Sequence, residues 1–394
     1  MSARPSTTPP TTTPPSTTTT TTSPLGPPSP LSPSTSPSPP VRIGALAPLS
    51  RPGWTEAGRH LLAGLELAAD EVNAGGGIAG RPLELLVRDT AADPRRAEAA
   101  VDELDALGVA ALAGEYHSVA ARAAATRADA LGLPFLCSSA VIDALTERPA
   151  DRVARLAPAQ SHGWRVYAEF LRAAGHTRLA LATEPSAYWA AGARVLREEL
   201  APRGGTVTEL DARALSPAAL AGELAAGGAT ALLLLTGFPD PAVELVRTVR
   251  RDPRLAGLLI GAPAGQPEFA EWAALLGGEA GGIPFLRYLP AHPTALGARV
   301  EATLRDRLAA APSFVAFEGY DTVTVLAETL RAHGADRTAV ADAWPHVVVE
   351  GTRGKIRFTR PSDGAPVWQW DRPPVQVSDR DPADPTRFRT LHTA

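Results

Sequence analysis

AALAGEYHSVAARAAATRADALGLPFLCSSAVIDALT, residues 110–146, is the stretch from which the fold is predicted. Its apolar start predicts a short buried strand over 110–113. Ser118 is a helix-capping residue type and Gly132 a helix-ending one, which predicts a helix between them whose buried face runs through Val119, Ala123, Ala130 and Leu131. Pro134 to Cys137 is then the next buried strand. Two strands joined through a helix are parallel, so their carboxyl ends lie at the same edge of a sheet.

Polar side chains gather where these two strands end. Beside a helix N-terminus with free N–H groups, they form a suitable place to hold the carboxylate or carbonyl of a small molecule. Taken singly, each has a plainer interpretation, since Ser118 also fits a helix cap and the later serines also fit a turn. Taken together, they favour a ligand site, and the set is Glu115, Tyr116, His117, Ser118, Ser138 and Ser139.

The same alternation of strand and helix extends outward in both directions. Upstream, strands are predicted at 41–48 and 83–88, with helices at 55–74 and 94–107. From Ser161 the rhythm restarts, with strands at 178–183, 206–210, 230–235 and 258–260. The roughly 350 residues that follow the first 40 are too many for one compact core. We therefore predict an α/β fold of two doubly wound lobes with parallel sheets.

The domain boundaries follow from composition and from this rhythm. Residues 1–40 are almost entirely Pro, Thr and Ser and are predicted to be disordered. We assign 41–156 plus about 290–335 to the first lobe and 157–289 plus about 336–370 to the second. The tail, 371–394, is rich in Pro, Asp and Arg and is predicted to be loosely packed.

Several classes of function are disfavoured. The net charge of −4 and the absence of a basic stripe disfavour nucleic-acid binding. Gly75, Gly77 and Gly80 fit G-x-G-x-x-G, but they follow a predicted helix, so we interpret them as a helix end and a chain reversal. No catalytic motif is present, and the eight histidines are not spaced as metal ligands. We therefore expect no enzyme activity, no cofactor and no metal site.

A family resemblance rests on VRIGALAPLS (41–50), ELAADEVNAGGGIAGR (66–81), the stretch 110–146 quoted above, and EGYDTVTVLAETLRA (318–332). Over about residues 41–370 the chain resembles the leucine/isoleucine/valine-binding branch of the type 1 periplasmic-binding fold, whose members are substrate-binding proteins of ABC transporters. The resemblance implies two lobes joined by a three-crossover hinge, which close on a small ligand.

It also implies particular ligand contacts. Residues after the third and fourth strands and aromatic residues of the second lobe match the family pattern: Ser118, Ser139, Ala140, Val141, Tyr188 and Phe238. The turn Tyr116–Ser118 resembles the Tyr-x-Ser turn of amide- and urea-binding members. The family's acidic residue for a ligand amino group is absent near Ala264, and Glu115 is a possible substitute. Trp54 either walls the cleft or packs a surface turn.

Two functions are expected from this. The first is a protein that binds a small polar solute (an amino acid, amide or related compound) as the substrate-binding component of an ABC-type importer, with a permease as partner. The alternative is the ligand-sensing domain of a receptor or regulatory protein, tethered by residues 1–40, with a receptor or kinase module as partner. Both imply an extracytoplasmic location, although the first residues show no apolar signal segment and no lipobox cysteine.

Overall fold

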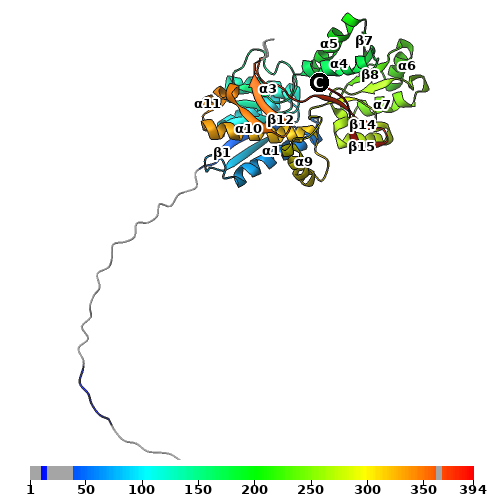
Figure 1. The fold of residues 1–394 in the computed structure, drawn as a ribbon. Helices are drawn as coiled ribbons and strands as arrows, with labels where there is room; N and C mark the ends of the chain where they lie inside the picture. The colour runs from blue at the N-terminus through cyan, green and yellow to red at the C-terminus, as the bar shows by residue number, and fades with distance from the viewer. Residues whose placement is uncertain (1–9, 16–38, 361–365) are drawn as a thin grey trace, which may run out of the picture. The chain divides into compact units, whose positions relative to one another are not determined.

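The structure, a computed structural model, describes residues 10–15, 39–360 and 366–394. Most of the segment predicted to be disordered, 1–40, lies outside the described residues, and residues 10–15 are exposed. The described residues from 39 onward form one unit, in which two groups of elements surround separate sheets (Figure 1). We call these groups lobe 1 and lobe 2.

Lobe 1 contains β1 (Val41–Ala47), α1 (Thr55–Ala74), β2 (Leu83–Asp89), α2 (Pro94–Ala106), β3 (Ala111–Gly114), α3 (Ser118–Ala130), β4 (Phe135–Cys137), β5 (Val153–Arg155), α9 (Ala295–Leu308), α10 (Phe314–His333), α11 (Arg337–Asp342), η5 (Trp344–His346), β11 (Val348–Gly351), β12 (Gly354–Thr359) and β13 (Trp368–Trp370). Its eight-stranded sheet has the order β11-β12-β13-β5-β4-β3-β1-β2. The strands from β5 to β2 are parallel, as the predicted strand–helix–strand units require.

Lobe 2 contains α4 (Gln160–Ala173), β6 (Arg178–Thr183), α5 (Ala187–Leu200), η1 (Ala201–Arg203), β7 (Thr206–Asp211), α6 (Pro217–Gly227), β8 (Ala231–Leu235), α7 (Ala242–Arg251), η2 (Pro253–Leu255), β9 (Leu259–Gly261), η3 (Gln266–Glu268), α8 (Ala270–Leu276), η4 (Gly277–Ala280), β10 (Phe285–Arg287), β14 (Gln376–Asp381) and β15 (Asp384–Thr393). One sheet is parallel, with the order β7-β6-β8-β9, and a second is antiparallel, with the order β10-β14-β15.

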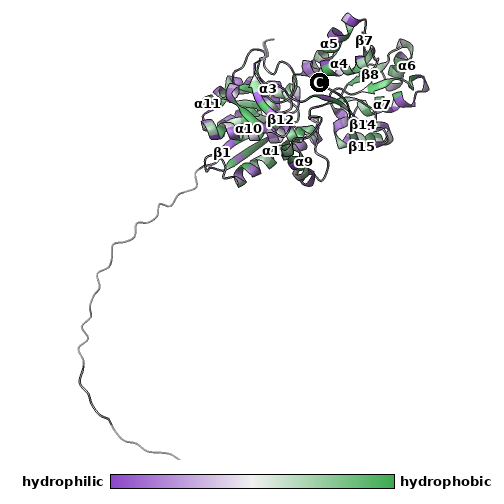
Figure 2. Ribbon diagram, in the orientation of Figure 1, coloured by the Kyte–Doolittle hydropathy of each residue, from purple (hydrophilic) through white to green (hydrophobic). Residues whose placement is uncertain are grey.

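Apolar side chains on both faces of the parallel strands hold each lobe together. In β6, Leu179 and Leu181 face the cluster formed with α4 and α5, whereas Ala180 and Ala182 face α6, α7 and α8. Such strands are continuously hydrophobic because helices cover both faces of the sheet. The hydropathy colouring shows this pattern, with green strands inside and purple residues on the outer helix surfaces (Figure 2). The predicted α/β fold with parallel sheets in two lobes is confirmed.

The chain passes between the lobes three times: after β5, after β10 and after β13. The first and third crossings start side by side, because Trp368 of β13 pairs in parallel with Ala154 of β5. Two buried polar side chains join them: Arg155 Nε donates to Gln369 Oε1 at 2.7 Å, and Gln369 Nε2 donates to the Ala157 carbonyl at 2.8 Å. The three crossovers implied by the family resemblance are therefore present.

The assignment of 336–370 to the second lobe is wrong. The strands of this segment, β11, β12 and β13, extend the sheet of lobe 1. Their position depends on pairing with the edge of β5, which lies about 200 residues earlier in the chain, and local sequence patterns carry no information on that pairing.

The tail is not loosely packed. Its two strands, β14 and β15, form an antiparallel pair that β10 completes, and Val377, Ser378 and Asp379 are buried. Two of its arginines, a residue type that suggested a solvated tail, have partners: Arg389 donates to both oxygens of Asp379, at 3.0 and 2.6 Å, and Arg380 stacks over Phe388.

The predicted buried face of α3 is also wrong. The helix buries Ala120, Ala121, Ala124, Ala125 and Ala128, while Val119 is 46% exposed. An alanine-rich helix has small apolar residues on every side. Its one larger apolar residue, Val119, was therefore a poor guide to which face of the helix is buried.

Candidate ligand-binding cleft

A cavity of about 190 Å³ lies where the carboxyl ends of the two parallel sheets meet. Lobe 1 contributes the segments after β1, β3 and β4 and the start of α10; lobe 2 contributes the segments after β6, β8 and β9, and the second crossing adds one tyrosine. Ligands in open α/β sheets bind at this end of the strands. The cavity is lined by Trp54, Tyr116, His117, Ser118, Val119, Ser139, Val141, Ser186, Tyr188, Trp189, Gly237, Ala264, Tyr288 and Phe314.

The structure brings six of the nine predicted site residues to this cavity: Trp54, Tyr116, Ser118, Ser139, Val141 and Tyr188. The other three, Glu115, Ala140 and Phe238, are not among its lining. Ala140 is fully buried in the core of lobe 1. Phe238 packs behind the wall, with its ring 6.1 Å from Trp54 and 5.7 Å from Trp272. Of the two interpretations of Trp54, the cleft wall is the one that fits this position.

Glu115 faces the interior of lobe 1, so it does not supply the missing acidic group of the cleft. Its carboxyl group is fully buried and accepts three hydrogen bonds: from Thr90 Oγ1 at 2.6 Å and from the backbone N–H groups of Tyr116 and His117 at 2.8 Å each. Burial raises the pKa of Glu115 to about 7 despite these bonds. Glu115 therefore fixes the turn that presents Tyr116 and His117 to the cavity.

His117 enters the cavity as a neutral donor. Its Nε2 accepts the backbone N–H of Trp54 at 3.0 Å, so the ring proton sits on Nδ1. Burial lowers the pKa of His117 to about 4, which keeps the ring uncharged at neutral pH. The same bond ties the segment after β1 to the turn after β3 and sets the position of Trp54.

The first turn of α3 supplies further donors. No side chain caps this helix, whose first two residues, Ser118 and Val119, line the cavity. Ser118 Oγ accepts the backbone N–H of Ile142 at 3.3 Å, which leaves the hydroxyl hydrogen available to a ligand. Free backbone N–H groups together with this hydroxyl suit a carboxylate or carbonyl oxygen.

Aromatic rings form the remaining walls. Trp54 lies 5.8 Å from Tyr116, Tyr188 lies 4.8 Å from Trp189, and Tyr288 lies 5.0 Å from Phe314, measured between ring centroids. Burial raises the pKa of the three tyrosine hydroxyl groups, so they stay protonated and can donate hydrogen bonds.

The lining that the structure describes contains no Asp, Glu, Lys or Arg side chain. At the position where the family resemblance places an acid, Ala264 lines the cavity. The cavity is therefore a mainly aromatic space with hydroxyl, imidazole and backbone N–H donors. Burying a charged ligand group here requires those donors to replace its hydration.

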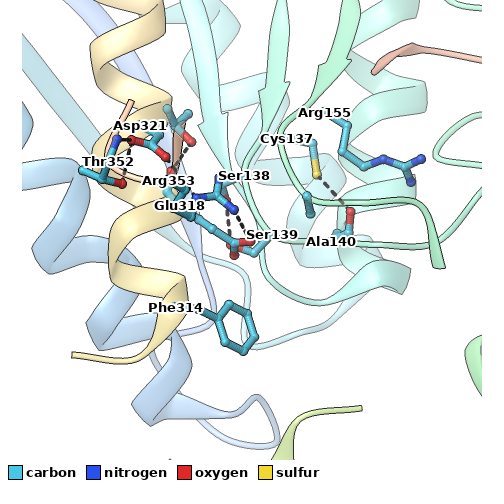
Figure 3. A network of polar contacts seen from close by, with 12 residues as sticks. Cys137, Ser138, Ser139, Ala140, Arg155, Phe314, Glu318, Asp321, Thr352 and Arg353 are labelled. Carbon is cyan, nitrogen blue, oxygen red and sulfur yellow. Dashed lines mark hydrogen bonds and ion pairs between the residues drawn. The ribbon is translucent and has the colours of Figure 1, made fainter. Parts of the chain in front are cut away.

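A buried ionic cluster lies behind Ser139 (Figure 3). Arg353, in the turn between β11 and β12, donates to Glu318 at 3.1 Å and to Asp321 at 3.0 Å, both on α10. Thr352 donates its N–H and its hydroxyl to Asp321, at 2.6 and 2.8 Å. Burial raises the pKa of Glu318 to about 7 although Arg353 opposes the shift. This cluster anchors α10, whose first residue, Phe314, lines the cavity.

The sequence prediction missed six lining residues: Val119, Ser186, Trp189, Gly237, Tyr288 and Phe314. His117 belonged to the predicted set of polar residues, and Ala264 stands where the family resemblance places an acidic residue. A signal existed for Ser186 and Trp189, because they are sequence neighbours of Tyr188 at the start of α5. Tyr288 and Phe314 come from the second crossing and the returning helix, and no local pattern connects them to the cleft.

Among the described residues, no group of three or more His, Cys, Asp or Glu side chains is arranged to hold a metal ion. The helices that the structure describes include none that is both long and apolar enough to cross a membrane.

Comparison with known proteins gives the family. The family model described as "Periplasmic binding protein" matches residues 40–371. Leu/Ile/Val-binding protein homolog 8 of Brucella abortus is 38% identical over 109 residues, which is 27% of this chain and 27% of that protein. Homolog 7 of Brucella melitensis is 34% identical over 119 residues, 30% of this chain and 29% of that protein. The chain thus matches less than a third of the length of these relatives.

Solved structures show the same fold. The branched-chain amino acid transporter substrate-binding protein LivJ of Streptococcus pneumoniae, in complex with isoleucine, superposes with a TM-score of 0.77 at 20% identity, covering 90% of this chain and 99% of that one. A solute-binding protein of an ABC transporter from R. palustris, in complex with benzoate, gives 0.74 at 18% identity, covering 90% and 96%. The resemblance to the leucine/isoleucine/valine-binding family is confirmed, and the chain belongs to the periplasmic binding protein family.

Proposed function

We propose that this protein is the extracytoplasmic solute-binding component of an ABC-type importer and that it delivers a small solute to a permease. The observation that carries the proposal is the cavity, whose walls come from both lobes. A ligand that contacts Tyr116 and Ser118 of lobe 1 and Tyr188 of lobe 2 binds the closed arrangement better than an open one. It therefore shifts the population toward closure, which a permease can recognise.

The chemistry of the lining suggests what the solute looks like. The free N–H groups at the start of α3 and the Ser118 hydroxyl suit a carboxylate or carbonyl end. The aromatic walls suit an apolar or planar body. A free ammonium group would meet no side-chain carboxylate on the described lining. We therefore favour carboxylates and amides without an amino group over α-amino acids, and the benzoate complex of the R. palustris protein is compatible with this preference.

Thermal unfolding of the full chain against a panel tests the binding role. The panel contains leucine, isoleucine, benzoate, small aliphatic carboxylates, amides and urea. A solute at 100 times its dissociation constant adds about 2.7 kcal/mol to the stability of the folded state, which is a shift of several degrees for a protein of this size. A shift with benzoate or an amide and none with leucine is expected. No shift with any member of the panel would contradict the proposal.

Uptake tests the transport role. Cells that carry the gene are expected to lose uptake of the solute that the panel identifies when the gene is deleted. The parent gene should restore uptake and the Tyr188→Ala gene should not. Unchanged uptake in the deletion strain would contradict an importer function while leaving solute binding intact.

A further inference from the structure

Two helices at the boundary between the lobes begin without a side-chain cap of their own. The residue before α8 is Phe269, which has no polar side chain, and the residue before α10 is Ser313, which makes no capping hydrogen bond. The Ser313 hydroxyl is instead 2.9 Å from His60 Nδ1. A helix start that is buried needs partners for its first N–H groups, so these must come from elsewhere in the molecule.

The start of α8 in lobe 2 is capped by lobe 1. Glu56, in the first turn of α1, accepts the backbone N–H of Ala270 on Oε1 at 2.7 Å and that of Glu271 on Oε2 at 3.0 Å. The Glu56 residue is 9% exposed, so water has little access to these bonds. A carboxylate at a helix N-terminus is favoured by both the free N–H groups and the helix dipole.

The start of α10 in lobe 1 is capped by lobe 2. Glu268, in η3, accepts the backbone N–H of Phe314 on Oε1 at 3.0 Å and is 4% exposed. Arg287 donates to both oxygens of Glu268, at 2.8 and 3.3 Å, and so holds this carboxylate in place from within lobe 2. Each lobe thus supplies one carboxylate to a helix start of the other.

One histidine connects the two contacts. His60 Nδ1 accepts the backbone N–H of Ser313 at 3.0 Å, which puts the ring proton on Nε2, and Nε2 lies 4.0 Å from Glu56 Oε1. Capping of α8 by Glu56 and capping of α10 by Glu268 are therefore parts of one continuous polar seam.

The seam also positions the cleft wall. Phe269 stands between Glu268 and the start of α8, and its ring lies 5.8 Å from Trp54 and 6.1 Å from Tyr116. Both of these partners line the cavity, whereas Phe269, Glu56 and Glu268 do not. Holding α8 against lobe 1 therefore holds Phe269 against the wall that a solute would touch.

We propose that Glu56 and Glu268 form a reciprocal clamp: they are positioning residues that hold the two lobes closed by capping each other's helices. Separation of the lobes breaks three charge-assisted hydrogen bonds, and each helix loses a cap that its own sequence does not replace. The clamp acts without touching the solute, so it sets how much of the protein is closed before any solute binds and how slowly a bound solute leaves.

The distance between the lobes, measured without solute, tests the clamp. Glu98→Cys on α2 and Glu223→Cys on α6 place one exposed spin label on each lobe, and the native Cys137 is buried and so protected from labelling. Pulsed electron paramagnetic resonance on the full chain then gives the populations of short and long distances. Glu56→Ala is expected to raise the ratio of open to closed molecules about tenfold, which corresponds to about 1.4 kcal/mol.

Glu56→Gln and Glu268→Gln are expected to give smaller increases, because an amide has one oxygen acceptor and no charge. If Glu56→Ala fails to fold, these two glutamine variants still test the proposal. Glu66→Ala, on the exposed side of α1, is the matched control and should leave the distances unchanged. A merely structural role would lower the unfolding temperature without lengthening the distance. The proposal would be overturned if Glu56→Ala, Glu56→Gln and Glu268→Gln all gave the same distances as the parent, or if the parent had no closed population. Either result holds whatever solute the cleft binds.

Discussion

At the scale of single residues, Glu115 shows how its surroundings decide what a carboxyl group does. The sequence placed it among polar residues at a strand end, and that placement is right. Its side chain, however, turns inward to Thr90 and to the N–H groups of the following turn. Sequence position fixes where the backbone lies, but the direction of the side chain depends on which buried donors need an acceptor.

Glu115→Gln is predicted to change how stability depends on pH. Burial raises the pKa of this carboxyl group from 4.5 to about 7, so the folded state holds a proton between these values that the unfolded state has lost. Its contribution to stability is therefore fully present below about pH 4.5 and is lost as the pH rises through about 7. The unfolding free energy of the parent relative to the variant should fall across this window, by up to about 1.4 kcal/mol per pH unit. Urea unfolding at pH 5, 6, 7 and 8 measures it, and parallel profiles would count against the prediction.

Gly114, at the end of β3, is predicted to tolerate no side chain. Its φ is +114°, and a Cβ atom there would lie 2.1 Å from the Leu46 carbonyl oxygen. Gly114→Ala should destabilise the protein by at least about 2 kcal/mol more than Gly76→Ala, because the latter has a φ of +94° but open space around it. Chemical unfolding of both variants makes the comparison. Equal losses would show that the contact with Leu46 does not matter.

At the scale of elements, the position of α10 depends on the ionic cluster around Arg353. The guanidinium group joins the turn between β11 and β12 to Glu318 and Asp321, and all three side chains are fully buried (Figure 3). Taking these charges out of water is costly, and their mutual pairing offsets that cost only while every member is present.

Arg353→Ala is accordingly predicted to destabilise the protein by about 3–5 kcal/mol, because it leaves two buried carboxylates without a partner. The loss should be greater at pH 8 than at pH 5, since protonation relieves the unpaired charges at the lower pH. Lys355→Ala is the matched control: its pair with Glu350 is exposed and 3.9 Å long, and its loss should cost under about 1 kcal/mol. An Arg353→Ala variant as stable as this control would refute the assigned role.

Most elements could be predicted from sequence because helices and buried parallel strands leave local patterns. The strand β8, for example, is the apolar run Ala231–Leu235, and Asp93 with Pro94 marks the start of α2. Partners across long distances leave no such pattern. The strand β13 belongs to lobe 1 because it pairs with β5, and the tail strand β14 is placed by pairing with β10, which lies about 90 residues earlier in the chain. These are the two places where the predicted boundaries failed.

At the scale of the whole molecule, the candidate site combines segments that the sequence separates by more than 250 residues. The turns after β3 and β4 could be predicted because parallel strands bring their carboxyl ends to one edge of a sheet. Tyr188, after β6, was implied by the family resemblance. Tyr288 and Phe314 could not be predicted, because they reach the cavity only through the second crossing and through the anchoring of α10. The clamp could likewise not be predicted from the sequence, since Glu56 and Ala270 are 214 residues apart and belong to different lobes.

Calorimetric titration of the full chain and of two cleft variants is the most direct test of the central claim, that one solute is held between the lobes. The titrant is the member of the solute panel that raises the unfolding temperature most. Tyr116→Ala removes a wall of lobe 1 and Tyr188→Ala a wall of lobe 2, whereas Glu66→Ala alters only an exposed residue of α1. Each tyrosine variant should bind at least about tenfold more weakly than the parent, with one site per molecule and an unchanged control. Affinity that survives either tyrosine substitution would contradict a solute held by both lobes.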